Sequence, residues 1–598
     1  MRNREGRLVP LNKRAETIAE YLEQDHWFNP EEAGSNRNPS SMKVIPERSQ
    51  EQRAEQRKKF ELEELKKALK KAKRNKEPGP DGVRMELLKW LSEENLWALL
   101  GTINHWWESK KAPPELYFAR IATIYKKGDT DKAGNYRPIS LLSSFYKIYM
   151  TLIRERIQAG IEQHVSRTQY GFRPAKSTSH AIFLIKRIQE YAESTGKPLY
   201  MTLLDWEKAF DKVDHSCLCK ALERFDVHPE VIEALKDGYD NARFYVRDQF
   251  GKSEARKQRA GIRQGCPLSP YLFVLVMACV DFDIQQSLTS EILDNRIPGT
   301  DFDMVYYADD TIIVSQSLEA CEQLIELTET FSEQYGLRLN KAKCVNMNMN
   351  ADGEQAFANG EAIKIEKETM YLGNQLNFKA DPNAEVTQKL QEVQRTLFRM
   401  QDYWKAAEAS PKWKVLIFEA VLKSKLLYGL ETTQLTNKCI KRIDAFQIRG
   451  LRKILNMKHT YWDRTATNKR ILKEATRVTF KQGTPEQVQR NQNREVKPFS
   501  VTWQARRQKL MGHLIRTSDD DPLRQVALQP SRADPIDVGK RRSGHPRKRW
   551  VSDVYNSLWK KHRHLVPRGG GRPFKRKKYK AKRKQHQHID DWARQRKF

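Results

Sequence analysis

Short apolar segments in the middle of the chain predict β-strands with charged residues at their ends. ARIATIYKK, at residues 119–127, is rich in β-branched residues and ends in two lysines. PLYMTLLD, at 198–205, ends in Asp205, and MVYY and TIIV, at 304–307 and 311–314, flank the sequence ADD. Such runs are typical of strands, and two of them around three residues are typical of a hairpin. The pattern therefore predicts a strand that ends at Asp205 and a hairpin with an acidic tip.

Apolar residues three and four positions apart predict helices on both sides of these strands. A highly charged helix is expected over about 52–75, and EPGPDG at 77–82 ends it, because two prolines and two glycines cannot continue a helix. A second helix is expected over about 85–97. YLFVLVMACV, at 271–280, predicts a buried helix that is too short to span a bilayer. The chain is then expected to be mostly helical from about 382 to 456.

Other segments are expected to be irregular. Residues 1 to about 50 are polar and include the loop-like PEEAGSNRNPSS. NYRPISLLSSFYKIYMTLIRERI, at 135–157, is expected to begin as a loop and become a helix. Past residue 540 the chain is strongly basic, and RGGGRPFKRKKYKAKRK, at 568–584, is expected to be disordered when unbound.

The charge balance points to a polyanionic partner. The 598 residues include 108 Lys and Arg but only 76 Asp and Glu, which gives a formal net charge of +32. Nucleic acid is the favoured partner, because neutralised phosphates release condensed counterions, and because 13 Trp, 21 Tyr and 23 Phe are interleaved with the basic residues. A basic, merely solvated surface is the alternative.

Cysteine usage and the N-terminal sequence predict an intracellular, soluble protein. The seven cysteines form no CxxC pair, which argues against a disulfide framework and a zinc knuckle and favours a reducing compartment. The N-terminus, MRNREGRLVPLNKRAE, contains no apolar leader segment.

Three carboxylates are candidates for a metal site. Asp309 and Asp310 are adjacent, and Asp205 ends a separate strand. Carboxylates held together at the edge of a core repel one another and lose hydration, and a divalent cation relieves both penalties. If the strands adjoin, the three groups suit a two-metal site for phosphoryl chemistry. A solvated acidic turn beside an unrelated Asp explains the spacing equally well.

Further candidates lie near glycines and at strand ends. In RAGIRQGCPLSPYLF, at 259–273, Gln264 and Gly265 precede an apolar helix, and glycine lets the backbone approach a ligand closely. Arg137 in NYRPISL and Lys126 in YKKGD could hold a triphosphate. A plain turn and solvated surface charges are the alternatives.

Taken together and in this order, the motifs resemble the reverse transcriptases of non-LTR (LINE-type) retrotransposons, in the branch with an apurinic-type endonuclease. The matching blocks run from about 79 to 376 and are GPDGVRMELLKW, IYKKGD, NYRPISLLSSFYKI, QYGFRPAKSTSHAI, LLDWEKAFDKVDH, GIRQGCPLSPYLF, YADD, GLRLNKAKC and YLGNQL. Looser similarity, in SKLLYGLETTQLT, IDAFQIRGLRKIL, MGHLIRTSDDDPLRQVAL and SGHPRKRWVSDV, extends it over most of 50–555. The amino-acid sequences of these motifs favour this family over retroviral enzymes, retrons and group II intron maturases.

The resemblance implies an α+β right-hand polymerase. It places an N-terminal linker and charged helix at 1–75, fingers at 76–197, palm at 198–380, a helical thumb at 381–460, a basic region at 461–555 and a polybasic tail at 556–598. The implied reaction is RNA-directed DNA polymerisation, in which a primer 3′-hydroxyl attacks the α-phosphate of a deoxynucleoside triphosphate. The alternatives are an RNA-dependent RNA polymerase and an inactive or domesticated copy that only binds nucleic acid.

The resemblance also implies a role for each candidate residue. The metal ligands, for two Mg²⁺ ions or possible Mn²⁺ substitutes, are Asp205, Asp309 and Asp310. Phe210 matches the steric gate against a 2′-hydroxyl, with a core aromatic as the alternative. The residues expected near the nucleotide, template or pyrophosphate are Lys126, Arg137, Gln264, Gly265, Tyr307, Ala308 and Lys343, with Lys341 competing for the role of Lys343. Residues 371–373 match the primer grip.

The chain departs from the family's full-length pattern. It lacks the upstream endonuclease and the Cys-His knuckle, and His513 and His545 are expected in basic loops without a metal role. We therefore expect a 5′-truncated copy or a partial reading frame that depends on a separate nuclease. The expected partners are an RNA template, a DNA primer or nicked target DNA and deoxynucleoside triphosphates, with no membrane. The expected location is the nucleus, after a cytoplasmic ribonucleoprotein stage.

Overall fold

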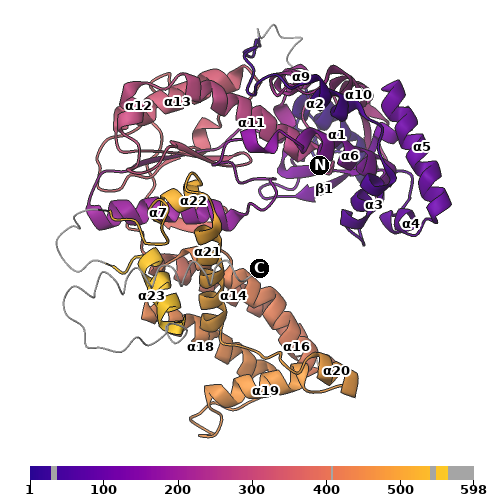
Figure 1. The fold of residues 1–598 in the computed structure, drawn as a ribbon. Coiled ribbons are helices and arrows are strands. Elements are labelled where there is room, and N and C mark those ends of the chain that lie inside the picture. Colours follow the sequence, from indigo (N-terminus) through magenta and orange to yellow (C-terminus); the bar gives the residue numbers. More distant parts are fainter. Residues whose placement is uncertain (29–36, 406–407, 539–546, 563–598) are drawn as a thin grey trace.

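The computed structural model describes residues 1–28, 37–405, 408–538 and 547–562. Figure 1 shows a body that contains two sheets and their helices, and a helical lobe that extends away from the central sheet. The mixture of helices and mainly antiparallel strands confirms the expected α+β class. The predicted disordered segment 568–584 and most of the PEEAGSNRNPSS loop lie outside the described residues. Among the described helices, none is long and apolar enough to cross a membrane.

The central sheet has the strand order β6-β7-β3-β8, and all its pairings are antiparallel. Its strands are β3 (Tyr200–Leu204), β6 (Met304–Tyr307), β7 (Asp310–Ser315) and β8 (Val345–Asn346). Side chains alternate between its two faces, as a pleated strand requires. One face is buried with α7 (Thr178–Thr195), and the other with α11 (Ser269–Gln286) and α13 (Leu318–Glu333). The predicted strand before Asp205 and the predicted hairpin are both confirmed.

The second sheet has the order β2-β1-β4-β5. Its strands are β1 (Phe118–Tyr125), β2 (Tyr136–Leu142), β4 (Arg243–Val246) and β5 (Arg256–Lys257). The strand expected at 119–127 is therefore confirmed, but the loop expected at the start of 135–157 is wrong. Residues 136–142 pair with β1 along the whole of β2, and Pro138 is tolerated because β2 is an edge strand. The predicted helix follows as α6 (Ser144–Gln158).

The N-terminal region is more ordered than its polar sequence predicts. Helix α1 (Arg14–Tyr21) and a π-helical turn (Leu22–His26) bury Ile18 and Trp27 against the body. The single helix expected at 52–75 is divided into α2 (Gln50–Arg57) and α3 (Leu62–Lys71), because Phe60 is buried between them and Glu61 starts a new capping box. The helix expected at 85–97 is likewise two helices, α4 (Met85–Lys89) and α5 (Glu93–Ser109), with Ser92 capping the second.

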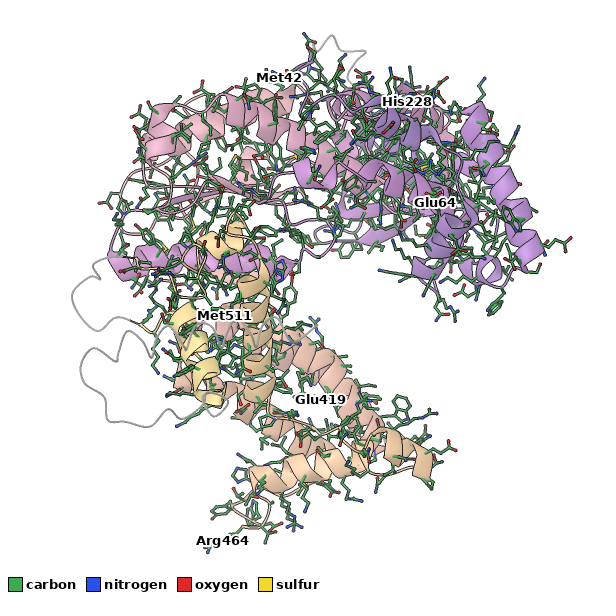
Figure 2. The ribbon with its side chains drawn as sticks, viewed as in Figure 1. Met42, Glu64, His228, Glu419, Arg464 and Met511 are labelled. Atoms are coloured by element: carbon green, nitrogen blue, oxygen red, sulfur yellow. The ribbon has the colours of Figure 1, made fainter. Side chains whose placement is uncertain are left out.

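The helical lobe begins at Pro382, and the mostly helical character predicted for 382–456 is confirmed. Its helices are α14 (Pro382–Arg399), α15 (Gln401–Lys405), α16 (Pro411–Ile417), α17 (Ser424–Leu427), α18 (Asn437–Ile454), α19 (Asn468–Phe480) and α20 (Pro485–Arg490). The chain then returns to the central sheet through α21 (Phe499–Arg516), α22 (Pro522–Gln525) and α23 (Trp550–His562). Side chains of α21 and α23, including Met511 in Figure 2, share a core with α7.

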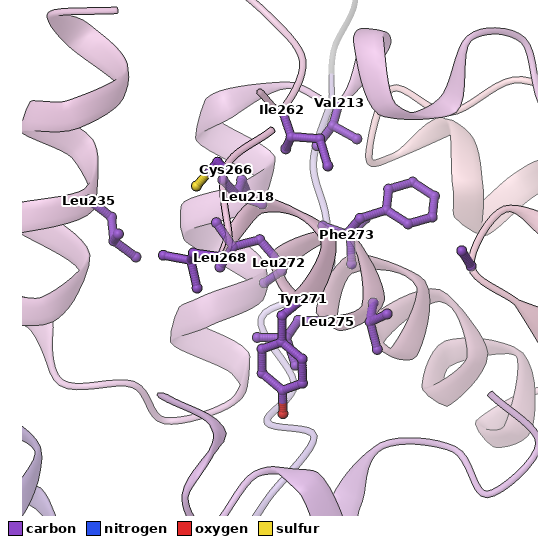
Figure 3. Close-up of a cluster of buried hydrophobic side chains, with 14 of the residues drawn as sticks. Val213, Leu218, Leu235, Ile262, Cys266, Leu268, Tyr271, Leu272, Phe273 and Leu275 are labelled. Atoms are coloured by element: carbon purple, nitrogen blue, oxygen red, sulfur yellow. The ribbon is translucent and has the colours of Figure 1, made fainter. Parts of the chain in front are cut away.

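The apolar run at 271–280 is buried within α11, as its sequence predicts. Figure 3 shows Leu272, Phe273 and Leu275 of this helix in a cluster with Leu218 and Leu235. The last two come from α9 (His215–Arg224) and α10 (Pro229–Asp240). The short α8 (Ala209–Lys212), α12 (Ser290–Asp294) and the hairpin of β9 (Glu368–Tyr371) and β10 (Asn374–Asn377) complete the body.

Candidate active site

The acidic turn between β6 and β7 is held in an unusual backbone conformation. Ala308 has a φ of +57°, and Tyr307 pairs with Asp310 across the hairpin. The buried side chain of Gln169 accepts a hydrogen bond from the Ala308 amide at 2.9 Å. A Cβ atom on the adjacent Gly171 would lie 2.3 Å from that same amide nitrogen, so only glycine fits there. The QYG segment at 169–171 therefore fixes the turn that carries Asp309.

Asp205 follows β3, the neighbour of β7 in the sheet. Leu204 pairs with Thr311, so the next residues along the two strands, Asp205 and Asp310, start from neighbouring backbone positions. The Asp205 carbonyl accepts a hydrogen bond from the Asn340 amide at 2.7 Å. The sheet thus brings the three aspartates predicted from the sequence to one edge.

The three carboxylates influence one another electrostatically. Burial raises the pKa of Asp310 to about 6, and the charges of Asp309 and Asp205 add to the rise. Burial and the charge of Asp205 also raise the pKa of Asp309, while Arg137 opposes the rise. In the described part of the chain, neither Asp309 nor Asp310 has an ion-pair partner. The tip of the hairpin therefore carries two carboxylates without an ion-pair partner among the described residues, and Arg137 acts on one of them through its charge.

A divalent cation fits the chemistry of these donors, because carboxylate oxygens are the ligands that Mg²⁺ and Mn²⁺ prefer. The side chains are nevertheless not arranged as a ready-made metal site. Among the described residues, no three Asp, Glu, His or Cys side chains are grouped closely enough to hold an ion. The Asp205 carboxylate lies instead 3.2 Å from the Lys343 ammonium.

The lysines of the LNKAKC segment have different partners. Lys343 contacts Asp205, whereas Lys341 forms an ion pair with Glu329 at 3.3 Å and lies over the Phe357 ring. The two lysines compete for one role in the sequence, and only Lys343 contacts a predicted metal ligand. The positive charge of Lys343 would attract an anionic group that binds beside Asp205.

Phe210 is partly a core residue and partly accessible. It lies in α8, after Lys208 with a φ of +50°, and its ring centroid is 4.5 Å from that of Phe273 and 5.9 Å from that of Phe172. The side chain remains half-buried. A half-buried ring that packs on two other rings is compatible with both the steric-gate role and the core role.

The turn at Gln264 and Gly265 packs against β2. The carbonyl of Gln264 accepts a hydrogen bond from the Ser140 amide at 2.8 Å. Gly265 has a φ of +140°, and a Cβ atom there would lie 2.3 Å from the Ser140 carbonyl oxygen. The side-chain amide of Gln264 donates to the buried carboxylate of Asp211. The close approach expected of Gly265 is therefore made to the protein's own backbone.

The two predicted fingers cations lie on neighbouring strands. Arg137 in β2 is exposed and acts on the charge of Asp309, and Lys126 follows the end of β1. Burial lowers the pKa of Lys126, and Arg137, Lys208 and Lys343 lower it further by repulsion, whereas Asp211 raises it. Cations that repel one another in this way favour an anionic ligand between them.

The segment 371–373 forms the tight end of the β9–β10 hairpin. Leu372 and Gly373 have φ values of +48° and +73°, as a two-residue turn of this type requires. The buried Tyr371 hydroxyl has no hydrogen-bond partner among the described residues, and burial together with Asp310 raises its pKa. The hairpin thus lies close enough to the acidic edge for the two to interact.

Three features of the site were not predicted. Gln169 lies within a quoted motif, and its amide chemistry was the available signal, but nothing showed its contact with Ala308. Asp211 likewise lies within a motif, but nothing in the sequence showed that its carboxylate accepts hydrogen bonds from Gln264. The N-terminal segment gave no signal, although Trp27 and His26 contact the Asp211 carboxylate at 3.4 and 3.0 Å.

The expectation of a basic loop around His513 is wrong. His513 lies in α21, which packs against α7. Its ring stacks on the ring of His180 in α7, with 4.7 Å between the ring centroids. His545 lies outside the described residues.

Comparison with known proteins connects this geometry to a family. Residues 124–376 match the family described as reverse transcriptase (RNA-dependent DNA polymerase), whose members use divalent metal ions. The chain is 28% identical over 392 residues to the transposon TX1 uncharacterized 149 kDa protein of Xenopus laevis, covering 64% of this chain and 29% of that protein. It is 27% identical over 411 residues to the RNA-directed DNA polymerase from mobile element jockey of Drosophila funebris, covering 66% and 43%.

A third relative is the Pol polyprotein from the type-1 retrotransposable element R2 of Popillia japonica, at 25% identity over 345 residues, with 54% of this chain and 46% of that protein covered. The chain thus spans less than half the length of each of these three relatives. Among solved structures, it resembles the RNA-dependent RNA polymerase of a human picobirnavirus with 13% identity and a TM-score of 0.41, covering 77% of this chain and 81% of that chain. The matched residues contain the central sheet and its acidic edge, so residues 124–376 form a reverse transcriptase domain, and this region is similar to the mobile-element proteins named above.

Proposed function

We propose that this chain is an RNA-directed DNA polymerase of a non-LTR retrotransposon, and that Asp205, Asp309 and Asp310 are its metal ligands. The observation that carries the proposal is the convergence of Asp205, Asp309 and Asp310 at one edge of the central sheet, within the matched domain. Two Mg²⁺ ions bound there would activate a primer 3′-hydroxyl and stabilise the departing pyrophosphate. Asp205 is then free to exchange its contact with Lys343 for one with metal.

The other residues bind and orient the nucleotide. Arg137 and Lys126 carry positive charge beside the acidic edge and bind the triphosphate, with Lys343 at the pyrophosphate. Phe210 presents its supported ring to the sugar and disfavours a 2′-hydroxyl. Gln264 and Gly265 with Tyr307 and Ala308 shape the pocket, and residues 371–373 grip the primer. In this assignment the fingers are 76–197, the palm 198–380 and the thumb 381–460.

The proposed partners follow from the reaction. They are an RNA template, a DNA primer such as a nicked target, and deoxynucleoside triphosphates. The net charge of +32 supports binding to both nucleic acids. Extension of a primer in genomic DNA would require the protein to act in the nucleus, after it assembles with its RNA in the cytoplasm.

The test is primer extension on an RNA template with Mg²⁺. The wild type should extend the primer with deoxynucleotides, and Asp309→Ala should remove extension without unfolding the chain. The matched control is Asp294→Ala, an exposed carboxylate of the same domain, which should extend normally. A folded wild type that binds the primer–template but does not extend it would favour the inactive, binding-only copy. Equal use of ribonucleotides would favour an RNA polymerase.

A further inference from the structure

The loop between α18 and α19 presents two adjacent aromatic rings to solvent. Tyr461 and Trp462 are 80% and 77% exposed, and their ring centroids lie 5.0 Å apart in an edge-to-face arrangement. The loop lies at the end of the helical lobe that points away from the central sheet, where Figure 2 labels Arg464. Aromatic side chains of this size normally bury most of their surface. Two neighbouring exposed rings therefore indicate a surface that a partner covers.

The loop has a fixed shape. The guanidinium of Arg452, a buried residue of α18, donates to the Lys458 carbonyl at 2.5 Å and to the Ala466 carbonyl at 2.6 Å, so it joins the two ends of the loop. Inside the loop, the Trp462 amide donates to the His459 carbonyl at 2.9 Å. A loop whose ends are joined loses little conformational entropy when its side chains bind a partner.

Positive charge surrounds the two rings. The segment 457–473 contains one acidic residue, Asp463, whose carboxylate accepts hydrogen bonds from the amide and hydroxyl of Thr465. The same segment carries five exposed basic residues, which are Lys458, Arg464, Lys469, Arg470 and Lys473. Apolar rings inside a basic surface are complementary to a partner that combines flat apolar groups with regular negative charge.

We propose that the loop at 457–467 binds single-stranded nucleic acid. Tyr461 and Trp462 stack on unpaired bases, and the surrounding lysines and arginines contact the phosphates. A duplex does not fit equally well, because its bases are already stacked inside the helix and offer no free face along its length. The inference rests on the proposed function only in so far as both require the chain to bind nucleic acid. The loop is separate from the acidic edge of the central sheet, so its binding can be tested without catalysis.

The experiment measures binding of the full chain to a fluorescent 20-nucleotide RNA, the matching DNA strand and a blunt DNA duplex. Replacement of both rings, Tyr461→Ala with Trp462→Ala, should weaken single-strand binding about tenfold or more, because each stacked base contributes strongly. Duplex binding should change little. The relative loss on RNA and on DNA identifies which strand the loop prefers.

The salt dependence separates stacking from charge. The double aromatic variant should leave the slope of log Kd against log salt unchanged. Replacement of Lys458, Arg464 and Lys469 by Gln should lower the slope by about 2, since each phosphate contact contributes about 0.7 on a single strand. The control variant is Trp97→Ala, an exposed tryptophan of α5 in the body, which should bind like the wild type.

Two results would overturn the proposal. One is wild-type affinity for both single strands in the double aromatic variant, with a normal unfolding temperature. The other is a wild-type dimer that the double variant dissociates, which would assign the rings to contact between two copies. A wild type that binds single strands through these rings but fails in primer extension would contradict the proposed function and leave this inference intact.

Discussion

The side-chain amide of Gln264 donates to both oxygens of the Asp211 carboxylate, at 3.1 and 3.2 Å. Asp211 follows Phe210 directly, so this contact connects the proposed sugar-sensing ring to the proposed nucleotide-facing turn. The same carboxylate contacts the His26 ring and accepts a hydrogen bond from the Trp27 indole of the N-terminal segment. Asp211, to which the sequence motifs gave no chemical role, thus positions Phe210 and Gln264, to which they did.

Asp211→Asn keeps the shape of the side chain but removes its charge. Gln264 loses a charge-assisted acceptor, which contributes about 1.5–3 kcal/mol when buried, so the turn becomes less well placed. We expect KM for the nucleotide to rise about tenfold and kcat to change less, measured by single-nucleotide extension. Asp240→Asn, at an exposed helix end, is the control. An unchanged KM would show that the contact is structural only.

Replacement of Phe210 tests sugar selection. Phe210→Ala removes the half-buried ring, and incorporation of ribonucleotides relative to deoxynucleotides should rise by about tenfold or more, because a difference of about 1.4 kcal/mol is tenfold in rate. Competition between the two nucleotide types on one template measures the ratio. Phe172→Ala removes a ring that contacts Phe210 without removing the gate, and it should leave the ratio near that of the wild type. Equal ratios in both variants would assign Phe210 to the core.

A buried ion pair connects α7, which covers one face of the central sheet, to the helical lobe. The Lys186 ammonium of α7 lies 2.8 and 2.7 Å from the two carboxylate oxygens of Glu385 in α14. Lys186→Met leaves a buried carboxylate unpaired and should lower the free energy of unfolding by about 3–5 kcal/mol, measured in urea. Adding Glu385→Leu should restore most of the loss. The exposed pair of Lys220 and Glu223 is the control, since Lys220→Met should cost about 0–1 kcal/mol. Similar losses for the two lysines would contradict the assignment.

The buried His180 makes stability depend on pH. Burial lowers its pKa to about 3, and repulsion from His513 and Lys176 contributes to the shift. In the unfolded chain a histidine has a pKa of about 6.5, so between these values the unfolded state binds more protons. The free energy of unfolding should therefore fall by about 2 kcal/mol as pH drops from 7.5 to 5.0. His180→Phe should remove this part of the slope in urea titrations, and the exposed His105→Phe should not. Parallel slopes for wild type and His180→Phe would refute the account.

Local pattern was enough to predict the strands that carry the three aspartates, but the expectation that these aspartates meet at one edge followed only from the resemblance of the motifs. The strand before Asp205 and the hairpin of β6 and β7 were predicted because each has a distinct apolar run of strand length. The α+β class and the reverse transcriptase domain followed from the motifs. Whether the individual residues have the expected catalytic roles stays a prediction.

Elements that depend on distant contacts were not predicted. β2 contains Pro138, which argues against a strand until its edge position is known. α1 is polar on most of its surface, and it is the contact of Trp27 with Phe244 and Asp211 that orders this region. The return of α21 to α7 likewise depends on partners more than 300 residues apart in sequence, such as His180 and His513.

The packing of α23 on α7 has a consequence for protein synthesis. The Trp550 amide donates to the Glu190 carboxylate, 360 residues earlier in the chain, and the Trp550 ring lies 4.9 Å from that of Phe183. A ribosome that adds about 5–20 residues per second emits Trp550 about 20–70 s after α7. Throughout this interval the apolar face of α7 lacks its final cover. A nascent chain of this protein therefore exposes part of the α7 surface until its last described helix has been made, and an expression fragment that ends at residue 460 would leave that surface exposed permanently.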